Sequence, residues 1–505
     1  MQLNIVANFI GRFWGALMAW AFVPIYIRFM GIESYGLVGF FATLQTIFML
    51  INLGLGRSFE IEVARLSAGQ EDQQTTHNLL RTLEILYWTA AILIVILLIF
   101  LAPSISNYWL IAPGFSPNAL QLIIVMIGIL IGLNLIQGLY GIGLLALQKQ
   151  VRFNVINSTF GTLQAVGAIL ALSFIAPTIQ VFFEWQIIIN IIWTVAVLFA
   201  LRRAMGPVSS APRFDKKLLL DIRHLTAGIT GIAVLTTIFS SADKVILSKM
   251  LTLEYFGYYT LAWGAASLLA LVTSPIATAV FPRMVQIVER RDEGALTKIY
   301  HQSCQLQTMT VFPIALVLVF FSSEFLFLWT GSPAIVANAH IILSVLVLGA
   351  AIASLSVVPQ NLQLAYKWTK LAVILQLVSV IALIPLIIWL TINYGIVGAP
   401  VALLAVNIFY VAVFVVLTHQ RYLKHEYSRW LLRDTVIPAV GTATVVVIAR
   451  LIAPASLSRL NILFELAMIF ALAITVAASL SPEVRPIIKG NYQLLRESLP
   501  FFSSK

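Results

Sequence analysis

Apolar runs alternate with short polar connectors along the whole chain. Each run is about 20 residues long, which is enough to cross the hydrocarbon of a bilayer as an α-helix. The pattern predicts fourteen membrane helices, at roughly 3–26, 34–56, 82–102, 119–147, 155–176, 179–201, 226–248, 255–281, 303–329, 337–358, 371–391, 397–418, 434–453 and 460–480. We therefore expect an all-α polytopic membrane protein.

One polar stretch occurs twice, each time between two apolar runs. Residues 24–36 and 243–257 align when the second is shifted back by 221 positions. The shift pairs Arg28 with Lys249, Glu33 with Glu254, Tyr35 with Phe256 and Gly36 with Gly257. A period this long is not that of a solenoid repeat. It is typical of transporters built from two similar halves, so we expect two six-helix lobes related by pseudo-two-fold symmetry about an axis roughly normal to the membrane.

This repeat, with the connectors, predicts the domain organisation. The first lobe is 1–201, and the second lobe is 226–418. Between them lies a cytoplasmic linker, 202–225, and after them come helices 13 and 14 (419–480) and a cytoplasmic tail (481–505). The linker carries an apolar stripe at helical spacing, formed by Phe214, Leu218, Ile222 and Leu225. This stripe predicts a short helix lying on the inner membrane surface.

Composition agrees with a membrane protein. Of the 505 residues, 60% are hydrophobic and 10% are charged, and the mean hydropathy is +0.96. Soluble domains carry roughly 25% charged residues. The one cysteine, Cys304, excludes an internal disulfide and a cysteine-based metal cluster.

The basic residues predict the orientation of the chain. With a cytoplasmic N-terminus, 25 of the 31 Lys and Arg residues fall in inner connectors or the tail, and five lie at the outer side. Such a bias follows the positive-inside rule, so both termini should be cytoplasmic. The net charge of +11 is spread over connectors rather than gathered in a basic domain, and we expect no nucleic-acid partner.

Motifs for enzyme chemistry are absent from the sequence. There is no phosphate-binding Gly-x-x-x-x-Gly-Lys loop, no Gly-x-Ser-x-Gly elbow and no His-Glu-x-x-His zinc motif. The six histidines do not cluster as metal ligands. We expect neither enzymatic activity, nor a cofactor, nor a bound metal.

Arg12 is the charged residue placed deepest in a predicted helix. It lies about nine residues into the first run, ~14 Å along a helix axis. A cation at such depth costs at least ~2.5–3.5 kcal/mol on insertion scales. Asn4 and Asn8 share its helix face. Either Arg12 reaches back to the inner surface or a neighbouring carbonyl, or it lines a wet cavity and binds an anion.

Weaker polar stripes lie on other predicted helices. Asn52, Asn134 and Gln186 each belong to one of them. Individually, such residues more often hold helices together than bind a ligand. Together with Arg12 and Asn8 they are the candidate substrate-binding residues.

Several motifs make the chain resemble a known family. These are Asn8-x-x-Gly11, Pro24-x-Tyr-x-Arg28-x-Met-Gly31-x-Glu-x-Tyr35-Gly36, Asn52-Leu-Gly54-Leu-Gly56, Ser241-Ala-Asp243-Lys244, Glu254-x-x-Gly257-x-Tyr259, Phe327-Leu-Trp329-Thr-Gly331 and Tyr394-Gly395-Ile-Val-Gly398-Ala399. In order and spacing, over roughly residues 1–418, they resemble polysaccharide-type flippases of lipid-linked oligosaccharides. These flippases belong to the multidrug/oligosaccharidyl-lipid/polysaccharide exporter superfamily. Helices 13 and 14 resemble the extra pair found in some of its branches.

The resemblance implies a mechanism and roles for residues. Two lobes surround a central cavity that opens alternately to each side and passes a sugar-diphosphate head group, while the polyprenyl tail stays in lipid. Arg12 is the position that fits a cationic contact to the diphosphate. Six charged residues in and beside the repeated stretch are the candidate gating residues: Arg28, Glu33, Asp243, Lys244, Lys249 and Glu254.

The sequence therefore predicts a flippase that moves a polyprenyl-diphosphate-linked oligosaccharide across the bacterial cytoplasmic membrane. Its expected partners are the lipid-linked saccharide, membrane lipids and other membrane proteins of polysaccharide assembly. A multidrug exporter of the same superfamily is the alternative within transport. A membrane-embedded glycan polymerase would need a large outer loop or a carboxylate pair, and neither is found in the sequence. A purely structural membrane protein would explain neither Arg12 nor the repeated halves.

Overall fold

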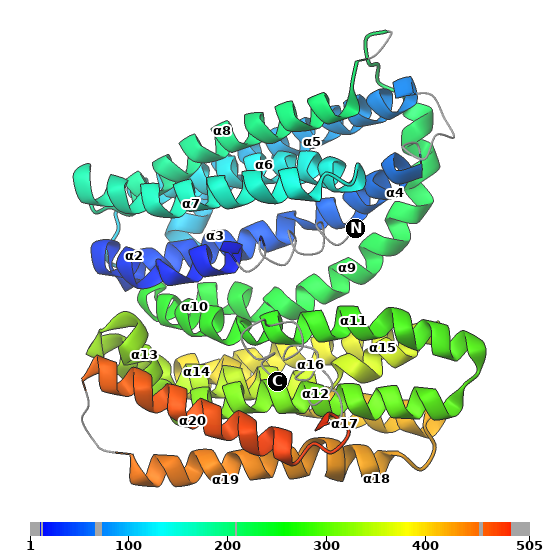
Figure 1. Ribbon diagram of the computed structural model, residues 1–505. Helices are drawn as coiled ribbons and strands as arrows, with labels where there is room; N and C mark the ends of the chain where they lie inside the picture. Colours follow the sequence, from blue (N-terminus) through cyan, green and yellow to red (C-terminus); the bar gives the residue numbers. More distant parts are fainter. Residues whose placement is uncertain (1–10, 12–13, 66–72, 208–209, 454–457, 486–505) are drawn as a thin grey trace, which may run out of the picture. The chain divides into compact units, whose positions relative to one another are not determined.

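The computed structural model describes residues 11, 14–65, 73–207, 210–453 and 458–485, which are almost wholly helical (Figure 1). Up to residue 267 the elements are α2 (Val23–Met30), α3 (Ile32–Phe48), the π-helix η1 (Asn52–Gly56), α4 (Arg57–Arg65), α5 (Gln73–Ser104), the π-helix η3 (Ile105–Trp109), α6 (Pro117–Ala146), α7 (Gln150–Phe174), α8 (Ile179–Met205), α9 (Lys216–Met250) and α10 (Leu253–Ser267).

The remaining elements are α11 (Leu269–Arg290), α12 (Glu293–Phe320), α13 (Ser322–Thr330), α14 (Pro333–Ser354), α15 (Val357–Ala365), α16 (Lys370–Tyr394), the 3-10 turn η4 (Gly395–Val397), α17 (Gly398–Tyr422), α18 (Tyr427–Arg429), the π-helix η5 (Trp430–Val436), α19 (Ile437–Ile452) and α20 (Arg459–Ser479). Every predicted membrane run after the first falls on helix. Part of the first run, 3–26, lies outside the described residues, and its described part belongs to the apolar helix Trp14–Met30.

Ten helices in the described part of the chain are long and apolar enough to cross a membrane. A helix is suited to this because it pairs every interior backbone N–H and C=O within its own segment. The predicted number of fourteen crossings remains a prediction.

Several helices begin at residues that can cap them. Ser116 and Ser332 precede α6 and α14, and their side chains accept hydrogen bonds from the backbone N–H groups of Ala119 and Ile335. Each serine is followed by a proline at the first helical position, where the missing N–H is not needed. Short Ser-Pro sequences therefore fix where these two apolar runs start.

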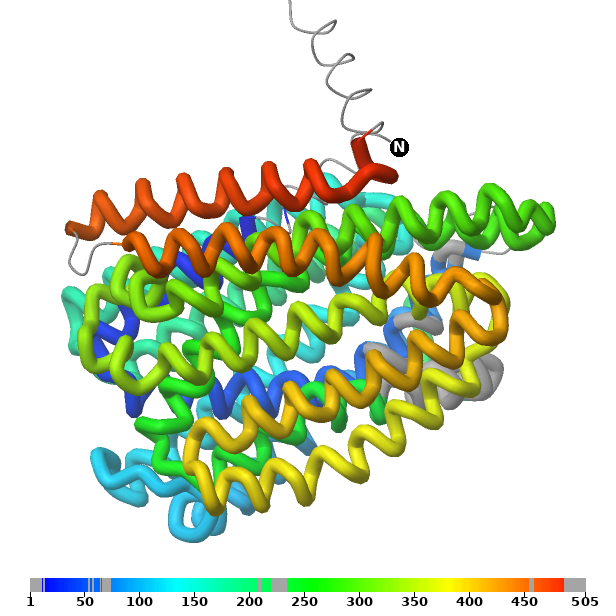
Figure 2. The backbone as a smooth tube through the Cα atoms, turned by 90° about the horizontal axis from the view of Figure 1, so that it is seen from below, coloured from blue at the N-terminus to red at the C-terminus, as the bar shows by residue number. Residues whose placement is uncertain are grey.

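Contacts divide the chain into two compact units, residues 1–260 and 261–505. The boundary lies within α10, beyond the predicted linker 202–225. In the first unit α6 is the central helix and packs against α5 and α8. In the second unit α12 is central, and Figure 2 shows α19 and α20 running alongside it. The predicted lobes and their limits remain predictions.

The stripe at 214–225 does not form a separate short helix. Residues 216–250 are one continuous helix, α9 (Figure 1). The side chain of Asp215 caps its N-terminus. No proline interrupts this segment, and extending an existing helix is easier than starting a second one. The expected short helix is therefore part of α9, and its place on the inner membrane surface stays a prediction.

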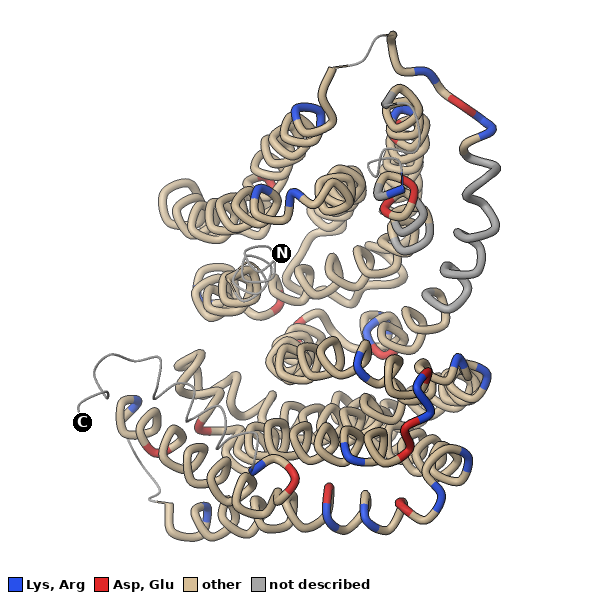
Figure 3. Tube along the Cα trace, turned by 45° about the vertical axis from the view of Figure 1, so that its right-hand side comes forward, with Lys and Arg blue, Asp and Glu red and all other residues tan. Residues whose placement is uncertain are grey.

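Many large apolar side chains face outward. Phe100, Phe174, Phe199 and Phe464 are each at least 67% exposed. Charged residues, by contrast, lie mainly at helix ends and in connectors (Figure 3). An apolar surface of this extent is unfavourable in water, but it is the expected outer surface of helices surrounded by lipid.

Candidate functional site

The two copies of the repeated stretch meet where α3 and α10 begin. Gly36 of α3 lies so close to α10 that a Cβ atom added to it would overlap the backbone carbonyl of Leu253. Gly257 of α10 lies equally close to the carbonyl of Ile32. Ile32 and Leu253 are separated by 221 positions, as are Gly36 and Gly257. The contact is therefore reciprocal, as at an interface made by a two-fold axis.

A third pair lies on this local axis. A Cβ atom added to Gly39 would overlap the side chain of Thr260, and these two residues are also 221 positions apart. A residue that contacts its own equivalent must lie at the axis itself. The repeat is visible in the sequence, but the packing of its two copies against each other is not. We call this contact the α3–α10 crossing.

The entry into α3 depends on one glycine. Gly31 separates α2 from α3 with φ of 82°, in the left-handed region that residues with a Cβ atom seldom adopt. This turn aims α3 at α10. Arg28, in the last turn of α2, is exposed.

Glu33 and Glu254 occupy equivalent positions but have different partners. The Glu33 carboxylate accepts a hydrogen bond of 3.0 Å from the backbone N–H of Gly114, in the loop before α6. The Glu254 carboxylate accepts one of 3.3 Å from the hydroxyl of Tyr258, one turn further along α10. Glu33 therefore ties a loop to the crossing, and Glu254 makes a contact within its own helix.

Lys249 lies at the end of α9, beside the segment that follows α5. Its ammonium group is 5.9 Å from the centre of the Trp109 ring, within the range of a cation–π contact. The Trp109 indole N–H donates a hydrogen bond of 3.0 Å to the Ser248 hydroxyl. The backbone N–H of Leu253 donates one of 2.8 Å to the carbonyl of Ile111. The loop after η3 is thus fixed to the junction of α9 and α10.

Asp243 and Lys244 lie deeper in the same helix. Asp243 is 1% exposed and forms an ion pair with Lys244 at 3.3 Å, and the Tyr259 hydroxyl donates a hydrogen bond to it. Lys244 also donates to the carbonyl of Ser240 at 2.8 Å. An ion pair this deep is retained only when its charges are well hydrogen-bonded, because both have lost water. Asp243 meets this requirement through Lys244 and Tyr259.

The candidate substrate-binding residues are not all found at one place. Arg12 and Asn8 lie outside the described residues. Asn52 begins η1, donates a hydrogen bond of 3.0 Å to the Met49 sulfur, and packs against Gly138 of α6. Its buried side-chain oxygen has no hydrogen-bond partner in the structure. An unpaired buried acceptor is unusual and is a candidate contact for a ligand or water.

Asn134 and Gln186 differ in their surroundings. Asn134 is half-buried on α6, one turn before Gly138, and so lies on the same helix face as the residue that meets Asn52. Gln186 is buried between α7 and α8, and its side-chain oxygen accepts a hydrogen bond from Gln164. This contact joins α7 to α8, as is common for such polar stripes.

A buried charged cluster in the second unit was missed. His301 of α12 contacts Asp434 of η5 through Nδ1 and Glu426 through Nε2, the latter at 3.0 Å. Gln305 donates to Asp434 at 2.8 Å and accepts a hydrogen bond of 2.9 Å from the backbone N–H of Glu483. His301 and Asp434 are fully buried. The sequence does contain one signal of this cluster: His301 and Gln305 lie one turn apart at the start of an apolar run.

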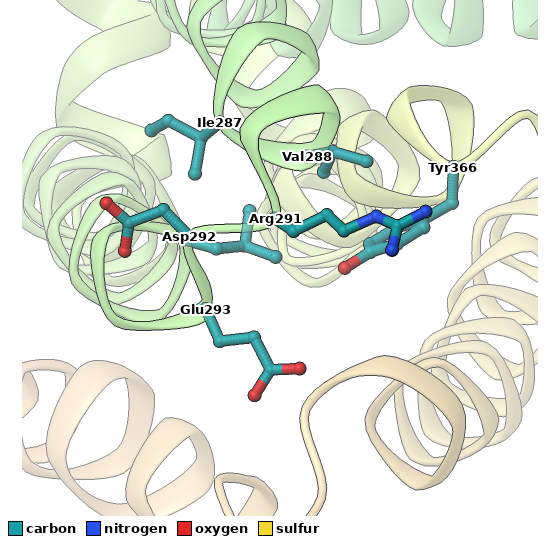
Figure 4. A pocket seen from close by; sticks show the side chains of 7 residues that line it. Ile287, Val288, Arg291, Asp292, Glu293 and Tyr366 are labelled. Carbon is teal, nitrogen blue, oxygen red and sulfur yellow. The ribbon is translucent and has the colours of Figure 1, made fainter.

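A cavity of about 300 Å³ lies at the turn between α11 and α12. Figure 4 shows Arg291 extending toward Tyr366, with the carboxylates of Asp292 and Glu293 pointing in other directions. Asp292 caps α12 by accepting a hydrogen bond from Ala295. Burial, with Glu293 nearby, raises the pKa of the Tyr366 hydroxyl. Because carboxylates flank the arginine, we do not assign this cavity to an anion.

The chain is similar to a known protein family and to a curated protein. A family model described as "Polysaccharide biosynthesis protein" matches residues 25–333. The probable low-salt glycan biosynthesis flippase Agl15 of Haloferax volcanii is 25% identical over 164 residues, which are 32% of this chain and 34% of that protein. The match thus spans about a third of the curated relative.

Two solved structures share the fold. The lipid II flippase MurJ in an inward closed conformation superposes with a TM-score of 0.72 at 16% identity, over 97% of this chain and 100% of that chain. A multidrug resistance MATE family transporter of the MOP superfamily, inward-facing, gives 0.68 at 14% identity, over 81% of this chain and 94% of that chain. The predicted all-helical, polytopic membrane fold and the predicted family resemblance are confirmed.

Proposed function

Because this chain belongs to the polysaccharide biosynthesis protein family, we propose that it is a flippase which translocates a polyprenyl-diphosphate-linked oligosaccharide across the bacterial cytoplasmic membrane by alternating access. The observation that carries the proposal is the α3–α10 crossing. Equivalent helices of two repeats pack backbone to backbone about a local two-fold axis, and alternating access is commonly a movement of one repeat against the other.

The crossing supports a gating role for the charged residues around it. Close glycine contacts have little side-chain bulk to interdigitate, so two helices packed in this way can separate with few rotamer changes. Glu33 holds the loop after η3, and Lys249 contacts Trp109 at the end of η3, beside the crossing. In the proposed cycle, these contacts break when the side of the protein that carries them opens. The gating roles of Arg28, Asp243, Lys244 and Glu254 are part of the same proposal.

The substrate class follows from physical chemistry as well as from the family. A diphosphate cannot enter hydrocarbon without compensation of its charge, and an arginine can hold phosphate oxygens in a bidentate fork. We propose Arg12 for this contact, with Asn8, Asn52, Asn134 and Gln186 as the polar residues of the same pathway. The unpaired oxygen of Asn52 supports this assignment for one of them. Other membrane proteins of polysaccharide assembly are the proposed partners.

A multidrug exporter is the second candidate, and the likeness to a MATE family transporter supports it. One experiment separates the two functions. In a strain that lacks the gene, we expect a lipid-linked saccharide to accumulate in the membrane, measured by mass spectrometry of the lipid extract, and surface glycan to fall. Re-expression of the wild-type chain should reverse both effects. Unchanged lipid-linked saccharides together with raised sensitivity to cationic drugs would favour the multidrug exporter.

A further inference from the structure

A second pocket lies in the first unit, beside the α3–α10 crossing. It has a volume of about 500 Å³ and is walled by α3, by the end of α5 with η3, and by the end of α9. Phe40, Leu44 and Ile47 line it from α3, and Leu101 and Ile105 line it from the opposite wall. The volume is many times the roughly 30 Å³ that one water molecule occupies.

Two hydroxyl groups in the wall, those of Thr43 and Ser248, already donate their hydrogen bonds within the protein. Thr43 donates its hydrogen bond to the carbonyl of Gly39 at 2.8 Å, and Ser248 donates to the carbonyl of Val245 at 2.8 Å. Ser248 also accepts the hydrogen bond of Trp109. An ordered water needs several polar partners, and a large apolar cavity stays dry or holds hydrocarbon. Since the wall formed by α5 and η3 belongs to a helical span, Gln74–Trp109, of membrane-spanning length and composition, hydrocarbon chains are the medium beside it.

One end of the pocket is polar and positively charged. Lys249 lies there and is exposed, and no carboxylate in the described part of the chain is within ion-pair distance of it. Trp109 lies beside it, and Tyr108 is 77% exposed at the same end. Aromatic side chains and a lysine together are typical of the level where phospholipid head groups begin. A lysine with no carboxylate partner is available to pair with a phosphate.

We propose that this pocket binds one acyl chain of a membrane phospholipid, with the lipid phosphate at Lys249 and anionic head groups preferred. The occupant is a resident lipid and not the transported substrate, so the site goes beyond the proposed function. Because α3 carries both the pocket and the crossing, and α9 leads directly into α10, a bound lipid stabilises the arrangement in which Gly36 and Gly257 are packed.

Photolabelling of the full-length protein tests the site. The protein is placed in phosphatidylcholine nanodiscs that contain a trace of phosphatidylglycerol with a diazirine near the end of one acyl chain. After illumination, digestion and mass spectrometry, adducts are expected to concentrate in peptides that carry residues 40–47 and 101–109. The same photoprobe on phosphatidylcholine should label these peptides less.

Variants make the test specific. Lys249→Glu should lower the labelling by about five-fold or more, since a single lysine near an anionic lipid surface has an effect of that order. Leu44→Trp should lower it by filling the pocket. The control is Lys367→Glu, which makes the same change of charge at a lysine whose side chain is 85% exposed in the other unit. Thermal unfolding of each variant reports whether it is folded.

Two results would overturn the proposal. The first is labelling of residues 40–47 and 101–109 that neither Lys249→Glu nor Leu44→Trp reduces, which would mean general contact with lipid. The second is displacement of the photoprobe by a polyprenyl phosphate at lower concentration than by unlabelled phosphatidylglycerol, which would make the pocket a site for the carrier lipid.

Discussion

At the scale of single residues, the glycines of the α3–α10 crossing have the most direct physical role. Gly36 and Gly257 each face a backbone carbonyl rather than a side chain, and a backbone cannot move aside without moving the helix that carries it. Gly264, on the same helix as Gly257, has no other atom within 4 Å of an added Cβ. The chain therefore contains its own control for substitutions at the crossing.

We expect Gly36→Val and Gly257→Val to destabilise the packed crossing by about 1–3 kcal/mol, the usual effect of overpacking. The thermal unfolding temperature of the purified protein should fall by several degrees, and export should decrease. Gly264→Ala should leave both unchanged or raise stability slightly, because alanine favours helix more than glycine does. Equal behaviour of Gly36→Val and Gly264→Ala would mean that α3 and α10 do not pack in this way.

Arg12 is the proposed contact to the substrate diphosphate. Arg12→Ala should abolish or strongly reduce export at normal membrane abundance, and Arg12→Lys should retain part of it, since lysine offers a point charge in place of the fork. Arg12→Glu should be worse than Arg12→Ala because it repels a diphosphate. Export by each variant is measured as surface glycan in a deletion strain. The abundance of the variant in the membrane is the control. Normal export by Arg12→Ala would leave Arg12 as a residue that reaches to the membrane surface.

At the scale of elements, the cluster around His301 explains how the C-terminal helices are attached. Asp434 and Glu426, which precede α19, both contact His301 of α12. Glu483, which follows α20, donates its backbone N–H to Gln305 of α12 and forms an ion pair with Arg429 of α18. Arg429 pairs with Glu483 at 2.8 Å and with Glu426 at 3.6 Å. The polar contacts lie at one end of the two helices, and apolar packing around Phe321 and Val446 holds them further along.

Asp434→Asn replaces the buried carboxylate that contacts His301 with an uncharged amide. It should lower the free energy of unfolding by about 3–5 kcal/mol, as is typical when one member of a buried pair is lost. Helices α19 and α20 should then become more accessible, which amide hydrogen exchange of their peptides would detect. The neighbouring Arg433→Gln, at an exposed position, is the matched control. Unchanged exchange in both variants would show that apolar packing alone holds the pair.

At the scale of the whole molecule, the distribution of basic residues predicts the orientation in the membrane. The bias of basic residues predicts that Ser116 is outside and Ser210 is inside. Single cysteines at these positions, in a Cys304→Ser background, should react differently with an impermeant thiol reagent in intact cells: Ser116→Cys is labelled and Ser210→Cys is not. Permeabilised cells, in which both react, provide the control. The opposite pattern would invert the topology.

The sequence by itself determined the fold class, the positions of the apolar helices and the family. These follow from local properties of the chain. A run of apolar side chains, a Ser-Pro start and a charge that is costly in lipid each have the same effect whatever the rest of the chain contacts. The repeat at an offset of 221 was also visible, because equivalent helices keep equivalent residues.

The tertiary structure alone decided which of these features touch. It brought Gly36 to Leu253 and Gly257 to Ile32, paired His301 with Asp434 across 133 positions, and joined three separate segments around Lys249. It also showed that α9 includes the last part of the predicted linker, residues 216–225. Helix–helix contacts in lipid depend on close fit rather than on hydrophobicity, which is uniform along such a chain, so the apolar pattern carries little information about partners.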